Sequence, residues 1–216
     1  MDSGAASRRN VLACGIAMIL ASVVPEGLLG PAAAHAAAGD AEAKAFIEGL
    51  ADQAIAALTP PDISRSEREA RARGLLADNF AVPTIAQFVL GRFWRTATDA
   101  ERQEYLELFE GLIVVTYVDR FSRYSGEKLK VTRSTADAES GDVIVYSEIS
   151  RPAGQPIEVG WRVRRTGSGF KIVDVYVEGV SMGQTQRSEF SSVIRNNGGT
   201  VAALLEEMRR RVRQQT

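Results

Sequence analysis

Apolar residues recur with a helical spacing in the first half of the chain. Residues 40–58 place apolar side chains three or four positions apart, which predicts an amphipathic helix. Residues 64–79 predict a second, highly charged helix, and Pro83 opens a short third helix that Gly91 closes. The interleaved charges of the second helix are typical of a solvated surface, and they also suit a surface that binds a partner.

A capping box marks the start of the longest predicted helix. Thr98 and Glu101 have the spacing at which each side chain bonds the backbone N–H of the other residue. We therefore expect a helix from Asp99 to about Tyr124. Residues 112–118 are almost all apolar, which predicts that this part of the helix is buried on most sides.

After Gly126 the spacing changes to the alternation of strands. Four segments are rich in β-branched and aromatic residues, and short loops join them, which predicts an antiparallel meander. In the last segment apolar residues occupy both parities, so we expect both of its faces to be covered. The predicted strands are residues 128–133, 142–151, 156–165 and 170–177.

Two helices close the chain, at about residues 181–196 and 200–213, with a glycine-containing stop between them. Helices, then an antiparallel sheet, then helices again predict an α+β domain whose sheet is covered on its concave side by helices.

Residues 1–38 have the features of a secretory signal peptide. Arg8 and Arg9 precede a short apolar run and an alanine-rich segment, which predicts cleavage near residues 36–38 and export to the periplasm. The paired arginines also resemble a twin-arginine signal, so both export routes stay open. Residues 39–216 then form a single domain.

Loss of this segment limits the chemistry of the mature chain. Its removal takes away Cys14 and His35, which are the only cysteine and the only histidine. A thiol or imidazole catalyst and a Cys/His metal site are thereby excluded, and we predict no metal and no cofactor. The formal net charge of −1 argues against a dedicated nucleic-acid-binding protein.

Asp174 is the best candidate for an acid or base, because it lies among valines where burial would raise its pKa. A structural carboxylate bonded to an arginine or a helix N-terminus is the more frequent case. We therefore predict no catalytic residue and no enzyme. The basic residues near the C-terminus are interpreted as partners of the helix dipole, or as a contact for an acidic partner or for anionic lipid head groups.

Several segments together resemble the MlaC family of periplasmic lipid-binding proteins, also called toluene-tolerance proteins. They are the strand and turn of residues 172–181, the Arg187-Ser-Glu-Phe190 segment, the Gly198-Gly199 turn, and residues 90–94 with the capped helix after them. The segment Thr185-Gln-Arg187 is closer to the branch associated with hopanoid biosynthesis (HpnM-type).

The resemblance implies an NTF2/cystatin-like fold with a deep apolar pocket between the sheet and the helices. It implies a carrier of a phospholipid or a hopanoid, with an inner-membrane ABC transporter and an outer-membrane lipoprotein complex as partners. The expected lipid-binding residues combine sheet, helix and junction positions: Phe88, Trp94, Phe109, Ile113, Tyr117, Val145, Val159, Trp161, Val163, Val175, Val177, Met182 and Arg187.

Two other functions remain open at this point. One is an enzyme of the same architecture that uses Asp174 and a nearby tyrosine. The other is a non-catalytic periplasmic adaptor with a filled core, which binds its partner through the arginine-rich helices.

Overall fold

The computed structural model describes the backbone of residues 31–215 and the side chains of residues 39–214. The predicted signal peptide therefore lies largely outside the described residues. The helices are α1 (Pro31–Leu58), α2 (Arg65–Asn79), α3 (Val82–Leu90), the 3-10 helix η1 (Gly91–Arg95), α4 (Asp99–Phe121), α5 (Met182–Asn196) and α6 (Val201–Gln215). The strands are β1 (Leu129–Ala136), β2 (Val143–Ile149), β3 (Ile157–Thr166), β4 (Gly169–Val177) and β5 (Val180–Ser181).

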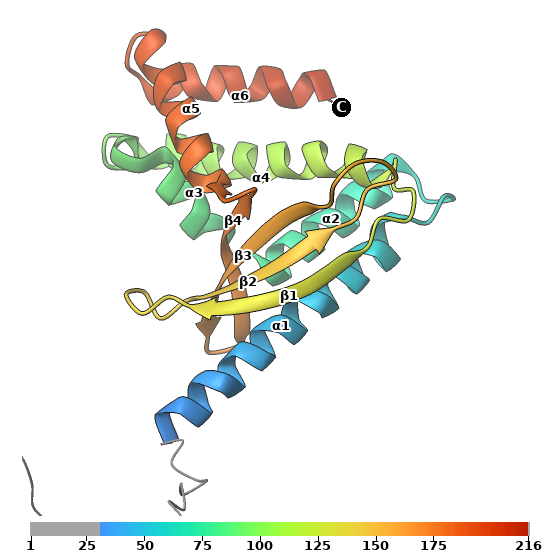
Figure 1. The fold of residues 1–216 in the computed structure, drawn as a ribbon. Helices are drawn as coiled ribbons and strands as arrows, with labels where there is room; N and C mark the ends of the chain where they lie inside the picture. Colours follow the sequence, from blue (N-terminus) through green and yellow to red (C-terminus); the bar gives the residue numbers. More distant parts are fainter. Residues whose placement is uncertain (1–30, 216) are drawn as a thin grey trace, which may run out of the picture.

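The α+β class and the antiparallel meander are confirmed, with strand order β1-β2-β3-β4-β5 (Figure 1). The sheet has a fifth strand where we expected four. Glu178 and Gly179 both adopt positive φ values, 50° and 77°, which make a tight turn. A turn with this twist returns the chain antiparallel to β4 before α5 begins.

The N-terminal helix also begins earlier than the predicted residue 40. Its backbone is helical from Pro31, through the alanine-rich segment in which we placed the cleavage site. Proline suits the first turn of a helix, and alanine has the highest helix propensity.

The pairing of β4 with β3 is interrupted by one irregularity. Arg162 pairs with Asp174 whereas Val163 pairs with Ile172, so Val173 is an extra residue in a β-bulge. The bulge reverses the parity of the strand at that point. The apolar residues on either side of it, Ile172 and Val175, therefore share one face of the sheet.

Two apolar cores hold the elements together. The first, here called the helical core, is formed mainly by helices α2, α3, α4, α5 and α6. It includes buried residues such as Leu90, Tyr105 and Met208. The second, the sheet core, joins α1 to β2, β3 and β4 through Ile47, Val145 and other buried side chains. Figure 1 shows α1 lying along the sheet, while α4 and α6 run side by side on the other side of the molecule.

Candidate functional site

The structure divides the predicted lipid-binding residues between the two cores. Trp94, Phe109 and Ile113 lie in or against the helical core, and Val145, Trp161, Val163 and Val175 lie in or against the sheet core. We expected the sheet residues to face the aromatic residues of α3 and α4. Instead α1 packs on β1 and β2, because its Ala43, Ile47 and Leu50 form a continuous apolar stripe.

The helical core is closely packed around Tyr105. This tyrosine is fully buried, and its hydroxyl donates to the carbonyl oxygen of Ala86 at 2.9 Å. Its ring centroid lies 5.7 Å from that of Phe109 and 6.3 Å from that of Phe190. Burial raises the pKa of Tyr105 far above its usual range, so this phenol stays neutral. These contacts account for Phe109 as a packing residue.

The sheet core changes from buried to half-exposed along one face. Val145 and Val163 are fully buried, while Trp161, Val175 and Val177 on the same face remain partly accessible. Val159 is also buried. This part of the face thus offers an apolar surface that the neighbouring helices cover incompletely.

Trp161 is held in place by a buried serine on the next strand. Its indole Nε1 donates to Oγ of Ser147 at 2.9 Å, and that hydroxyl donates to the carbonyl oxygen of Val159 at 3.3 Å. Because Ser147 is fully buried, the indole supplies the hydrogen-bond donor that its hydroxyl oxygen cannot obtain from water. Trp161 is therefore a fixed apolar wall.

Asp174 acts as a cap for α5. Its Oδ1 accepts from the N–H groups of Val175 at 2.8 Å and Gly183 at 3.0 Å. Its Oδ2 accepts from the hydroxyl of Ser181 at 2.6 Å, which also accepts from the N–H of Gln184. Both carboxylate oxygens are occupied at a helix N-terminus, so the arrangement is that of a structural carboxylate.

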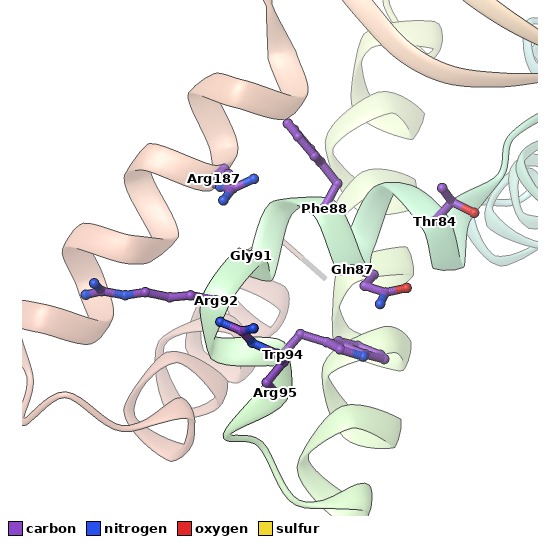
Figure 2. Close-up of a pocket in the computed structure, with 8 residues that line it drawn as sticks. All are labelled: Thr84, Gln87, Phe88, Gly91, Arg92, Trp94, Arg95 and Arg187. Carbon is purple, nitrogen blue, oxygen red and sulfur yellow. The ribbon is translucent and has the colours of Figure 1, made fainter. Parts of the chain in front are cut away.

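An open hollow of about 550 Å³ lies beside α3 and η1 (Figure 2). We refer to it as the arginine hollow. Two of the predicted aromatic residues and Arg187 line it, and its five other residues were not predicted as site residues from the sequence. The full lining is Thr84, Gln87, Phe88, Gly91, Arg92, Trp94, Arg95 and Arg187. The sequence did contain a signal for this basic site, because Arg92 and Arg95 both lie within four residues after the helix-closing Gly91.

Two further predicted residues, Tyr117 and Met182, also lie outside both cores. Tyr117 on α4 is 47% exposed, and the guanidinium carbon of Arg120 lies 5.7 Å from its ring centroid. Met182 is the first residue of α5 and is half-buried. The structure brings neither residue against the sheet core.

Within the described residues, His, Cys, Asp and Glu side chains form no group suited to holding a metal ion. The same part of the chain contains no helix long and apolar enough to cross a membrane.

Comparison with a solved structure supports the fold. A phospholipid-binding protein from Ralstonia solanacearum, solved in complex with a phospholipid, superposes with a TM-score of 0.69 at 24% sequence identity. The match covers 80% of this chain and 98% of the Ralstonia chain. The family described as MlaC protein matches residues 48–210, which is most of the chain. This chain belongs to the MlaC family.

Proposed function

We propose that this chain carries a phospholipid or a hopanoid through the periplasm and encloses its apolar part against the sheet. MlaC proteins are non-enzymatic lipid-binding carriers, and the Ralstonia relative was solved with a phospholipid. The observation that carries the proposal is the half-exposed apolar stretch formed by Trp161, Val175 and Val177. These side chains lie on one face, next to buried valines that already pack under α1.

The energetics of lipid in water require such an enclosure. Each methylene group removed from water contributes about 0.8 kcal/mol, so a two-chain lipid cannot cross an aqueous space unprotected. The same stabilisation makes spontaneous release slow. Exchange therefore needs docking partners, for which we propose an inner-membrane ABC transporter and an outer-membrane lipoprotein complex.

The proposal is tested by filling the half-exposed stretch. Val175→Trp adds bulk beside Trp161, so lipid that copurifies with the protein should fall several-fold while the fold is retained. Lipid is extracted with organic solvent and measured per mole of protein. Val163 is unsuitable for this test, because it is fully buried and a larger side chain would overpack the sheet core.

Lys130→Trp is the matched control. Lys130 is exposed on the edge strand β1, so the added indole reaches solvent and lipid content should match that of the unmodified protein. Equal lipid content in Val175→Trp and Lys130→Trp would contradict the proposed binding surface.

A further inference from the structure

Three cationic side chains from two elements line the arginine hollow. Arg92 and Arg95 come from η1, and Arg187 comes from α5 (Figure 2). A smaller hollow of about 370 Å³, which includes Phe93, Thr96 and Gly199, adjoins the same two η1 arginines. The basic surface therefore continues past the rim of the first hollow.

These three arginines differ from those of the charged helices. On α2 and α6, arginines pair with carboxylates, as Arg71 does with Glu67 and Arg211 with Glu207. Among the ion pairs formed by the described residues, none includes Arg92, Arg95 or Arg187. Their charges are thus available to an external anion.

The position of Arg187 depends on the end of α3. Gly91 adopts a φ of +59°, and a Cβ atom there would lie 2.9 Å from Nε of Arg187. The guanidinium carbon of Arg187 lies 5.1 Å from the ring centroid of Phe88. Gly91, which has no side chain, and the ring of Phe88 therefore fix the position of this guanidinium. Less conformational entropy is then lost when the guanidinium binds a ligand.

We propose that the arginine hollow binds a phosphate ester, of the kind that a phospholipid head group carries. The assignment of this ester to a lipid rests on the proposed function. Guanidinium groups bind phosphate through parallel hydrogen bonds. A phosphate group presents more acceptor oxygens than a carboxylate, which suits three arginines better. The concave shape suits a single inserted group better than the plane of a bilayer.

The first experiment uses glycerol phosphate as a soluble probe. Chemical shifts of the backbone amides are followed by NMR at low ionic strength, with glutarate as the carboxylate probe. The triple variant Arg92→Gln, Arg95→Gln, Arg187→Gln should bind glycerol phosphate at least about tenfold more weakly, because it loses charge-assisted hydrogen bonds.

The matched control is Arg120→Gln, Arg123→Gln, Arg213→Gln. It removes the same charge from the α4 and α6 ends and should keep the affinity within about twofold of the unmodified protein. If both triple variants bound glycerol phosphate equally weakly, the proposal would be overturned, because the loss of affinity would then follow from the change in net charge alone. Tighter binding of glutarate than of glycerol phosphate would also overturn it and would assign the hollow to an acidic protein segment.

The second experiment separates a lipid head group from a soluble ester. The protein is incubated with dispersions of dioleoylphosphatidylethanolamine or of dioleoylglycerol, which has the same chains without phosphate. The unmodified protein should retain more of the phospholipid, and the Arg92, Arg95, Arg187 variant should lose that preference while retaining dioleoylglycerol normally. A preference that survives in the variant would overturn the lipid source and leave a site for soluble phosphate esters.

Retention of neither lipid would instead contradict carriage of a phospholipid. The glycerol phosphate titration would then still decide the anion site alone, so the two proposals fail separately.

Discussion

Asp174 shows at the residue scale how one side chain joins two elements. It sits on β4, where it accepts from the N–H of Val175, and its hydrogen bonds with Ser181 and Gly183 fix the first turn of α5. Ser181 completes the cap by accepting from the N–H of Gln184. The carboxylate thus stabilises the junction between the sheet and the C-terminal helices.

Replacement of Asp174 should therefore act on stability. Asp174→Ala leaves the hydroxyl of Ser181 and the N–H of Gly183 without their acceptor, and should lower the free energy of unfolding by about 2 kcal/mol. Asp174→Asn keeps one acceptor oxygen and should cost clearly less. Urea denaturation measures both values; an equal and negligible effect of the two substitutions would rule out the capping role.

At the scale of elements, α4 and α6 are held together by apolar packing and by a polar contact at their edge. The two helices pack along each other through the helical core, with Leu204 and Met208 of α6 fully buried. At their solvent edge Nε of Arg209 donates to Oε1 of Glu104 at 2.6 Å. This hydrogen bond, against a smaller opposing effect of burial, holds the pKa of Glu104 below its usual value.

A lowered pKa in the folded state gives a defined pH dependence. The Glu104 carboxylate stabilises the fold above its unfolded pKa, and that contribution is lost as the pH falls through the lower folded pKa. Because the pair is substantially exposed, Glu104→Gln should lower the free energy of unfolding by at most about 1 kcal/mol near neutral pH. The difference between the variant and the unmodified protein should therefore be smaller at pH ~3 than near neutral pH.

Glu107→Gln is the control on the same helix. Glu107 accepts from the side chain of Gln103 and forms no ion pair with another described residue, so its substitution should leave the pH dependence unchanged. Unfolding monitored by circular dichroism at both pH values gives the comparison. A Glu104→Gln difference that is as large at about pH 3 as near neutral pH would contradict the ion-pair explanation.

Local signals explain which elements were predictable. The capping box at Thr98 and Glu101 is present and starts α4 at the predicted residue, and Gly91 ends α3 as predicted. Such features depend on a few neighbouring residues, and so the sequence displays them directly. The bulge at Val173 depends instead on how β4 pairs with β3. The spacing of apolar residues within β4 alone does not predict it.

The candidate site was less predictable for the same reason. The parity of β3 correctly placed Val159, Trp161 and Val163 on one face of the sheet. Which helix covers that face depends on tertiary packing, and α1 occupies the place assigned to α3 and α4. The arginine hollow likewise requires Arg187 to meet η1 across nearly a hundred residues of sequence, a contact that no local pattern contains.

At the scale of the whole molecule, two separate cores flank one sheet. The half-exposed apolar stretch proposed for the lipid chains borders the sheet core, and the helical core supports the arginine hollow through α3 and α5. β4 connects them, since it pairs with β3 and contacts α2, α3 and α5. An apolar surface and a cationic surface on one domain fit an amphipathic cargo.

Native mass spectrometry of the mature protein, purified from a periplasmic extract without detergent, tests lipid carriage most directly. We expect a discrete added mass that fragments as a phospholipid or a hopanoid, which would also identify the cargo. A bare chain mass that stays unchanged after incubation with lipid vesicles would contradict lipid carriage.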